Sequence, residues 1–320
     1  MEQRLQEQAV IPEELAGQRL DQALARLFPA YSRSRLQAWL KAGDLTVDGA
    51  PRRARDPVTG GEQVTLDTVV ATAGPAPEAE PLDLDVLHQD AHLLVIDKPP
   101  GLVVHPGAGN AGGTLQNALL HHFPELTALP RAGIVHRLDK DTSGLMVVAR
   151  SLAAHTALVA AIQARDVGRE YLAVVNGRFT GGGRVDAPVG RHPRDRTRMA
   201  SHSGGRPAVT HYRVEERFPA HTLLRCRLET GRTHQIRVHM ALIRHPIVGD
   251  PGYGGRVRLP PEPDEPVTAA LRGFRRQALH AARLTLNHPV SGETLEWSAP
   301  PPADFLALLE ALRRHRDGLG

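Results

Sequence analysis

Cysteine and lysine are scarce in this sequence of 320 residues, and long apolar runs are absent. A single cysteine, Cys226, excludes an internal disulfide framework and a zinc site built on cysteines, and we expect it to be buried in a strand. No run of about 18 apolar residues occurs, so no membrane-spanning helix is predicted. The first residues are polar and lack the apolar segment of a signal peptide, which makes the cytoplasm the expected location.

Lysine is also scarce. The sequence has 3 lysines, and the other 36 of its 39 basic residues are arginine. Against 35 acidic residues, this leaves a formal net charge of +4 and an isoelectric point near 9.6. The planar guanidinium suits phosphate and base contacts better than an ammonium does. The composition therefore permits nucleic-acid binding without proving it.

The first 70 residues have the pattern of a small domain in which two helices pack on a sheet. Apolar spacing predicts one helix over 19–28 and a second that begins after the N-cap Ser32. Short strands are expected over 45–49 and 62–66. Basic side chains surround the turns of this unit: Arg33, Arg35, Lys41, Arg52, Arg53 and Arg55.

Residues 71–81 are rich in proline and alanine and show no apolar periodicity, which predicts an extended linker. The remaining residues, 82–320, form the second predicted domain. Strands outnumber helices there and regular βαβ alternation is absent, so we expect an α+β fold with a mixed, largely antiparallel sheet. The expected strands are 93–96, 144–149, 171–175, 222–228 and 278–286. The expected helices are 114–123, 305–312 and two capped by Ser151 and Thr233, with a proline-rich loop over 256–266.

Two patterns typical of cofactor sites are incomplete here. Residues 107–112 match G-x-G-x-x-G, but a dinucleotide fingerprint follows a strand directly, and here His105 and Pro106 intervene. We interpret this segment as a flexible loop or as backbone that approaches a nucleic-acid phosphate. The 17 histidines include no H-E-x-x-H pattern. The sequence therefore predicts no metal and no nucleotide cofactor.

The segment with the strongest chemical pattern is 136–144, which lies between two apolar stretches. Its carboxylate Asp139 is flanked by Arg137 and Lys140, and nearby cations favour the ionised form. An ionised carboxylate can act as a nucleophile or as a base. The alternative interpretation is a salt-bridged turn without chemistry.

Two further segments are basic. In 231–240, Arg237 lies on the apolar side of a predicted helix, and a partly buried arginine needs a carboxylate partner. Asp139 is a plausible partner, although the sequence alone cannot pair the two residues. The second segment, 191–198, is an arginine-rich loop that contains one aspartate. It is either a solvated loop or a phosphate-contacting loop that suits RNA.

Together these segments resemble the RluA-type pseudouridine synthases, in particular the RluD-like group, over nearly the whole chain. Residues 136–144, 169–173 and 231–239 are similar to the three motifs of that family. Residues 98–107 match the opening of the RluD-like catalytic domain, and the first 70 residues resemble an S4 RNA-binding domain. Arg169 is a mild departure, because the family usually has lysine at that position.

The resemblance implies isomerisation of uridine to pseudouridine in large-subunit ribosomal RNA, in the helix 69 stem-loop, without a cofactor or metal. Asp139 would be the catalytic aspartate, and Arg237 would pair with it. Arg137 would enter the RNA helix while Tyr171 stacks on the target base, because such a base must first leave its stack. Contacts to RNA are expected from Arg33, Arg35, Lys41, Arg52, Arg53, Arg191, Arg194, Arg196, Arg198 and Arg232.

The expected partner is large-subunit ribosomal RNA or an assembling ribosomal subunit. One alternative is an enzyme of the same family that acts on another ribosomal or transfer RNA site. A second alternative is an S4 protein that assists ribosome assembly without catalysis. Loss of Asp139, Tyr171 or Arg237 would favour that second alternative, and all three are present.

Overall fold

The structure, a computed structural model, describes residues 2–29, 31, 33–71, 77–107, 109–195 and 197–319. The chain divides into two compact units, Met1–Ala76 and Pro77–Gly320, which are described separately below. The expected N-cap Ser32 and the predicted RNA contact Arg196 lie outside the described residues.

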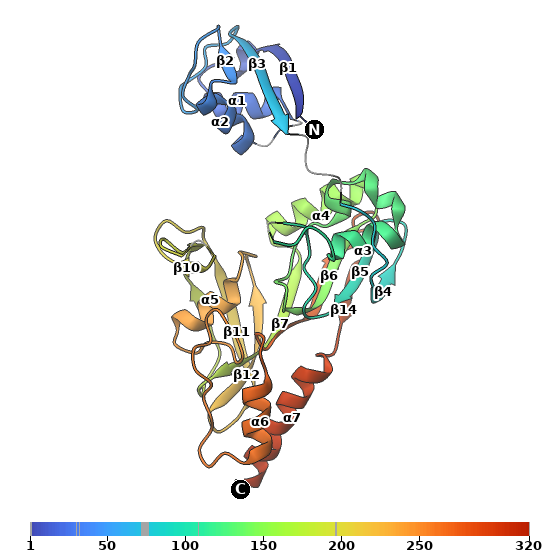
Figure 1. The fold of residues 1–320 in the computed structure, drawn as a ribbon, viewed down its shortest axis with the longest axis vertical. Coiled ribbons are helices and arrows are strands. Elements are labelled where there is room, and N and C mark those ends of the chain that lie inside the picture. The colour runs from blue at the N-terminus through green and yellow to red at the C-terminus, as the bar shows by residue number, and fades with distance from the viewer. Residues whose placement is uncertain are drawn as a thin grey trace. The chain divides into compact units, whose positions relative to one another are not determined.

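The first unit is a three-stranded antiparallel sheet with two helices, α1 (Leu20–Leu27) and α2 (Arg33–Ala42). The strand order is β1 (Glu2–Val10), β3 (Gln63–Ala71), β2 (Leu45–Val47), so β3 is central (Figure 1). Leu20, Leu24 and Leu36 of the helices pack on Leu45 and Leu66 of the strands. A short 3-10 turn, η1 (Glu13–Leu15), follows β1.

Strand β1 was not expected from the sequence. It pairs with β3 along its whole length, from Glu2 opposite Ala71 to Val10 opposite Gln63. Its residues are mainly polar, and of its side chains Leu5 and Ala9 pack against the core of this unit. Apolar alternation is therefore too weak to reveal the strand, whose order comes from backbone pairing.

The second unit is built on a nine-stranded sheet. Along the sheet the order is β4-β5-β6-β13-β7-β12-β11-β8, and β14 pairs with β13 at one side. Within the described residues, β6 and β13 run parallel and the other paired strands of this sheet run antiparallel. The expected mixed, largely antiparallel sheet is confirmed. The strands are β4 (Val86–Gln89), β5 (Leu93–Lys98), β6 (Ser143–Ala149), β7 (Gly168–Asn176), β8 (Gly183–Asp186), β11 (Val209–Arg217), β12 (His221–Leu228), β13 (Leu279–Asn287) and β14 (Thr294–Ser298).

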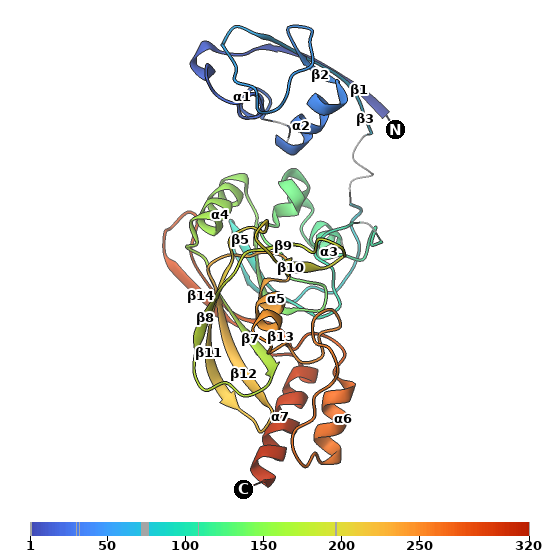
Figure 2. The ribbon, with the colours of Figure 1, turned by 90° about the vertical axis from the view of Figure 1, so that its left-hand side faces the viewer.

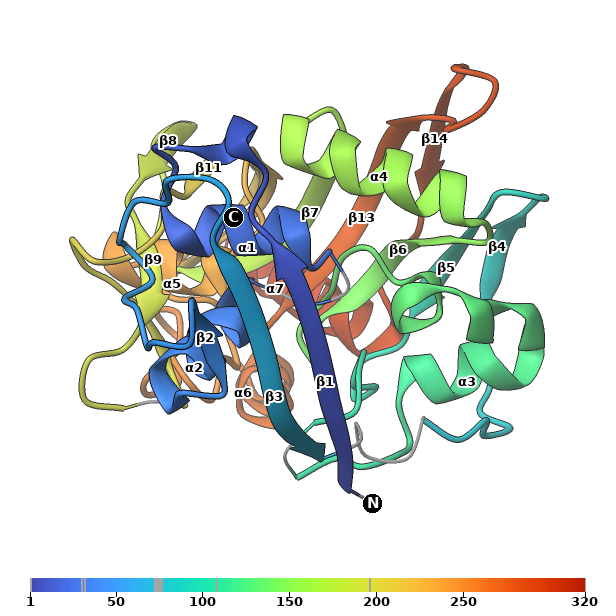
Figure 3. The ribbon, with the colours of Figure 1, turned by 90° about the horizontal axis from the view of Figure 1, so that it is seen from above.

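The helices of this unit cover both faces of the sheet (Figures 2 and 3). Their bounds are α3 (Leu115–His122), α4 (Leu152–Ala164), α5 (Gln235–Leu242), α6 (Glu265–Gly273) and α7 (Ala303–Gly318). Figure 3 shows α4 lying over the region where β6, β13 and β7 run side by side. Helices α6 and α7 lie against each other near the C-terminus (Figure 2). Smaller elements are η2 (Pro124–Ala128), η3 (Pro130–Gly133) and the hairpin of β9 (Val189–Arg191) and β10 (Met199–Ser201).

Strand β5 shows how the sheet separates two cores. Leu93 and Val95 pack with Leu158 of α4, whereas Leu94 and Ile96 belong to the larger core on the opposite face. Successive residues of a strand point to opposite faces, so a strand buried on both sides is a continuous apolar run. This explains why the apolar runs at 93–96 and 144–149 predict their strands correctly. Cys226 is fully buried in β12, as expected.

Two local expectations in this unit were wrong. The proline-rich loop was predicted to extend to Pro266, but α6 begins at Glu265, where the Asp264 side chain accepts a hydrogen bond from Val267 N. Proline in the first helical turn is compatible with this start, because no helical hydrogen bond is lost there. Thr233 does not cap α5. The N-cap is His234, in the left-handed region at φ 57°, and it makes no side-chain capping bond.

Residues at the end of the predicted linker pack on the second unit. Asn117 of α3 donates from Nδ2 to the Glu78 carbonyl at 2.7 Å and accepts from Glu80 N at 3.1 Å. The Glu80 carboxylate accepts from Gly113 N at 2.9 Å. These residues therefore form the edge of the second unit. Across the described residues, no helix is long and apolar enough to span a membrane.

Candidate active site

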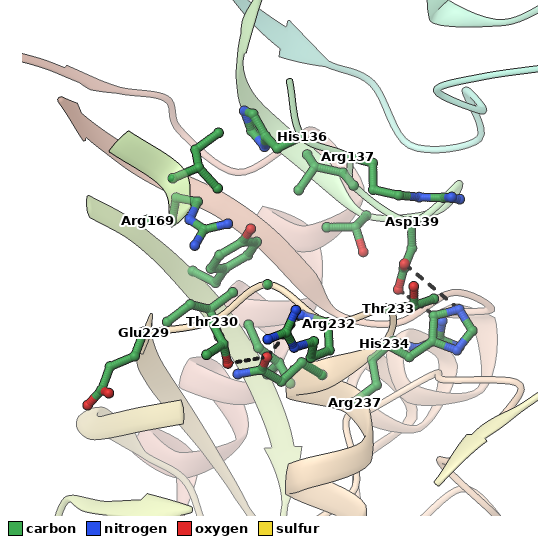
Figure 4. A pocket seen from close by; sticks show the side chains of 18 of the residues that line it. His136, Arg137, Asp139, Arg169, Glu229, Thr230, Arg232, Thr233, His234 and Arg237 are labelled. Atoms are coloured by element: carbon green, nitrogen blue, oxygen red, sulfur yellow. Dashed lines mark hydrogen bonds and ion pairs between the residues drawn. The ribbon is translucent and has the colours of Figure 1, made fainter. Parts of the chain in front are cut away.

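A cavity of about 400 Å³ opens where the turn before β6, strand β7 and the start of α5 meet (Figure 4). This volume falls in the range of about 300–1,000 Å³ that is typical of ligand pockets. The four residues expected to carry the chemistry all line it: Arg137, Asp139, Tyr171 and Arg237. Three sequence motifs separated by many residues therefore meet at one cavity.

Asp139 lies in the turn that leads into β6, with its side chain 17% exposed. Arg237 donates from Nη1 to Asp139 Oδ2 at 3.1 Å, so the expected pair is present. His234 Nε2 lies 3.8 Å from the other carboxylate oxygen, Oδ1 (Figure 4). In the described part of the chain, Asp139 forms its ion pair with Arg237 and lies near His234, and it forms none with Arg137 or Lys140.

Arg237 is held by a second carboxylate that the sequence did not reveal. Asp250, with no exposed side-chain area, accepts from Arg237 Nε at 2.7 Å and from Nη2 at 2.8 Å. Asp250 Oδ1 also accepts from the amides of Gly252 and Tyr253. Burial opposes the charge of Arg237, but hydrogen bonding to Asp250 and attraction to both carboxylates outweigh it and raise the pKa of Arg237. The guanidinium therefore stays charged beside Asp139.

Tyr253 connects this pair to the β9–β10 hairpin. Its hydroxyl lies 2.9 Å from His234 Nδ1 and accepts from Met199 N at 2.9 Å. Its ring contacts two guanidinium groups, those of Arg237 at 5.0 Å and Arg198 at 5.1 Å. Burial lowers the pKa of His234, which favours a neutral ring at neutral pH. The Tyr253 hydroxyl also donates to the Met199 carbonyl at 3.2 Å, and His234 Nε2 faces Asp139.

The turn that carries Asp139 is anchored by Lys98, which is 1% exposed. Its ammonium donates to the carbonyls of Pro99, Leu102 and Lys140 at 2.8, 3.0 and 2.9 Å. The Lys140 carbonyl also accepts from Gly101 N at 2.9 Å. Burial lowers the pKa of Lys98 to about 7. The segment Lys98–Leu102 is thus fastened directly to the turn that presents Asp139.

His136 and Gly144, which belong to the same segment 136–144 as Asp139, hold the local backbone in place. The Nε2 of His136 accepts from Val147 N at 3.0 Å, and burial lowers the pKa of His136 to about 3, so its ring is neutral. Gly144 adopts φ 113°, and a Cβ at this position would lie 2.3 Å from the Ala281 carbonyl oxygen. Glycine is therefore required where β6 approaches its parallel neighbour β13.

Tyr171 and Arg169 project from β7 into the same cavity. Tyr171 is 6% exposed, and burial raises its pKa, so the phenol is neutral at neutral pH. Arg137 is exposed at the cavity wall. The aromatic ring of Tyr171 and the exposed guanidinium of Arg137 therefore both line the cavity.

The predicted RNA contacts differ in their surroundings. Arg194 and Arg198 are exposed on the hairpin, and Arg191 is exposed at the end of β9. Arg232 lines the cavity and donates from Nε to the Pro207 carbonyl at 3.2 Å. Together with the contact between Arg198 and Tyr253, this places basic residues beside the cavity.

In the first unit, two of the residues predicted to contact RNA also form ion pairs within the fold. Arg33 Nη2 lies 2.7 Å from Asp21, which has no exposed side-chain area, and Arg52 lies 3.2 Å from Glu62. Their guanidinium groups are therefore partly occupied within the unit. The other three basic residues are exposed: Arg35, Lys41 and Arg53, with Arg35 stacked over Trp39 at 5.3 Å.

Known proteins resemble both units of this chain. The RNA pseudouridylate synthase family matches residues 92–242, and the S4 domain family matches residues 18–64. A relative from Xanthomonas campestris, "Ribosomal large subunit pseudouridine synthase D", is 60% identical over 96% of this chain and 92% of its own length. Proteins of the same name from Pseudomonas aeruginosa and Escherichia coli K12 are 56% and 52% identical, each over 99% of this chain, and over 99% and 98% of their own lengths.

Two solved structures share the catalytic fold. "Human RNA Pseudouridylate Synthase Domain Containing 4" aligns with TM-score 0.56 and 28% identity over 72% of this chain and 93% of its own. "Human RNA Pseudouridylate Synthase Domain Containing 1" aligns with TM-score 0.54 and 25% identity over 71% and 87% of the two chains.

The α+β fold and the similarity to these proteins define an RNA-modifying enzyme. The chain belongs to the RNA pseudouridylate synthase family and carries an S4 domain. It is an RNA pseudouridine synthase, an isomerase of uridine in RNA. The family and fold expected from the sequence motifs are confirmed.

Proposed function

We propose that this enzyme converts specific uridines of large-subunit ribosomal RNA into pseudouridine, in the helix 69 stem-loop, and that it works in the cytoplasm on free ribosomal RNA or assembling subunits. The observation that carries the proposal is the identity of 52–60%, over nearly the whole chain, to the three relatives named above. Basic residues beside the cavity and an S4 domain are compatible with a large, structured RNA substrate.

In this proposal Asp139 is the catalytic carboxylate. The reaction breaks the C1′–N1 bond, turns the uracil and forms a C1′–C5 bond, while the proton leaves C5 and N1 regains one. Asp139 is positioned for this role because Arg237 fixes one of its oxygens while the side chain keeps access to the cavity. Attack by Asp139 on C1′, attack on C6 and removal of a sugar proton are all compatible with a carboxylate in this position.

Arg137 and Tyr171 act on the target base before and during the reaction. The exposed guanidinium of Arg137 fills the gap that the flipped base leaves in the RNA stem. The ring of Tyr171 supports the flipped base, and its neutral hydroxyl lies near the proton that leaves C5. Exposed arginines of the hairpin and basic residues of the S4 domain contact phosphates around the loop.

Asp139→Asn tests the catalytic role. We expect loss of pseudouridine formation with RNA binding largely retained, because the amide keeps the shape but not the charge. Asp141→Asn makes the same change two residues further on, outside the cavity lining, and is the matched control. Turnover of Asp139→Asn within about tenfold of wild type, or 1.4 kcal/mol, would remove Asp139 from this role.

The substrate is tested by mapping pseudouridine in all ribosomal and transfer RNA from cells that lack the protein. Loss of the modification in the helix 69 stem-loop, restored by the wild-type gene but not by Asp139→Asn, is the expected result. Loss at another ribosomal site or in a transfer RNA would leave the enzyme class intact and change its substrate. An unchanged map would contradict the proposal.

A further inference from the structure

Arg169 is a buried arginine on the cavity wall. It is 7% exposed, and its Nε is buried without a hydrogen-bond partner among the described residues. In the same part of the chain it has no carboxylate within ion-pair distance. The comparably buried Arg237 lies between two carboxylates, Asp139 and Asp250. Of these two buried arginines at the cavity, Arg169 is the one for which the described residues supply no carboxylate partner.

The position of Arg169 directs it toward the substrate. It lies two residues before Tyr171 on β7, so the two side chains leave the same face of the strand. Both line the cavity, and Figure 4 shows the Arg169 guanidinium on the cavity wall opposite Asp139. Gly231 lies against it, because a Cβ there would be 2.7 Å from Arg169 Nη1. The small residue leaves the guanidinium room to face the cavity.

Nearby groups do not neutralise this charge. The ring of His136 is neutral, and Arg169 itself contributes to lowering its pKa after the larger effect of burial. Glu170 points to the opposite face and pairs with Arg225 at 3.4 Å. Glu229, the other carboxylate on the cavity wall, binds His211 and Arg165. A molecule in the cavity can therefore supply an acceptor that the described residues do not.

Leaving a buried cation unpaired costs stability, since desolvation is not repaid by a partner. Such a group is useful where a reaction develops negative charge. When the C1′–N1 bond breaks, its electron pair stays on the uracil and spreads to the carbonyl oxygens O2 and O4. Addition at C6 likewise places charge on O4. Each route therefore makes a uracil carbonyl a stronger acceptor than it is in the bound uridine.

We propose that Arg169 is a catalytic residue that donates hydrogen bonds to a carbonyl oxygen of the target uracil and stabilises the negative charge that gathers on the base. The planar guanidinium can present two parallel donors to such an oxygen or its neighbour. The proposal needs a uridine in the cavity and is independent of which RNA carries it.

The test compares Arg169→Met with wild type in single-turnover assays at saturating RNA. The RNA is a stem-loop that carries uridine, 2-thiouridine or 4-thiouridine at the target, because sulfur is the weaker hydrogen-bond acceptor. We expect Arg169→Met to slow the uridine reaction by about 10²- to 10³-fold, as for other donors to developing anions. For one thio substrate, the rate ratio of uridine to thiouridine should fall by about tenfold or more in the variant. Equal ratios in both proteins, for both thio positions, would overturn the proposal.

Stability without RNA separates this role from a structural one. Arg169→Met should melt at a higher temperature than wild type, because an unpaired buried charge is replaced by an apolar chain. Arg225→Met removes a paired arginine from the neighbouring strand β12 and should melt at the same or a lower temperature. Arg169→Lys should retain more activity than Arg169→Met. A lower melting temperature for Arg169→Met would show that the side chain has a structural role and would contradict the argument.

Discussion

Replacement of Arg237 by methionine should destabilise the enzyme as well as inactivate it. The substitution leaves Asp250, fully buried, with two backbone amides but no arginine, and leaves Asp139, 17% exposed, without its arginine partner. Breaking a buried pair in this way costs about 3–5 kcal/mol. At about 2–4 °C per kcal/mol for a unit of this size, the melting temperature should fall by roughly 6–20 °C.

The matched control is Arg283→Met. Arg283 pairs with Glu296 at 2.6 Å, but both side chains are more than 40% exposed, at 41% and 44%. An exposed pair contributes about 0–1 kcal/mol, so this variant should melt within a few degrees of wild type. Thermal melting followed by circular dichroism measures both effects on the full-length protein.

The second comparison is the double variant Arg237→Met with Asp250→Asn. Asparagine removes the buried charge that Arg237→Met leaves unpaired, so the double variant should be more stable than Arg237→Met alone. Its activity should stay low, because Asp139 still lacks its partner. Additive losses of stability, or a cost below about 1 kcal/mol for Arg237→Met, would refute the reasoning from buried charge.

Three other perturbations follow from the contacts described above. Tyr253→Phe removes the hydroxyl that orients His234, so turnover should fall by about tenfold and the loss should not add to that of His234→Ala, whereas an unchanged rate would contradict the link. The pKa of Lys98 is about 7 in the folded protein, against 10.5 for an ordinary lysine. Between pH 7 and pH 10.5 the unfolded chain therefore binds more protons at this residue than the folded protein does, so the contribution of Lys98 to the free energy of unfolding rises with pH in that range. Lys98→Met should remove that rise from the pH dependence of melting, and equal slopes would show that Lys98 is not the source. Deleting residues 1–75 should weaken binding to structured ribosomal RNA and reduce its salt dependence while turnover on a short stem-loop survives, and an equal salt slope would show that the S4 unit does not recruit RNA.

The sequence predicted the elements that rest on strong local patterns. The apolar run at 93–96 and the Ser151 cap correspond to β5 and α4, and the motifs around Asp139 and Arg237 meet at one cavity. The sequence could not reveal that Asp250 is the second carboxylate bound to Arg237, because a single aspartate after an apolar stretch belongs to no repeating pattern.

Elements defined by long-range pairing were also beyond local analysis. Strand β1 has few apolar residues, and its order comes from hydrogen bonds to β3. Lys98 was recognised as part of a motif, but its three carbonyl partners depend on how two distant turns meet. The N-cap of α5 is His234, in the left-handed region, and not the expected Thr233. His234 contacts Tyr253, and such a tertiary contact can outweigh a local preference for a capping residue.

The place of β13 in the sheet has a consequence for biosynthesis. It lies between β6 and β7, although it comes more than a hundred residues after both along the chain. Until β13 has been synthesised, β6 and β7 each have one edge without the strand that pairs with it in the finished sheet. Unpaired strand edges are prone to wrong pairing. Leu279, at the start of β13, also lines the cavity. The enzyme therefore cannot become competent during translation until this late strand has left the ribosome and closed the gap.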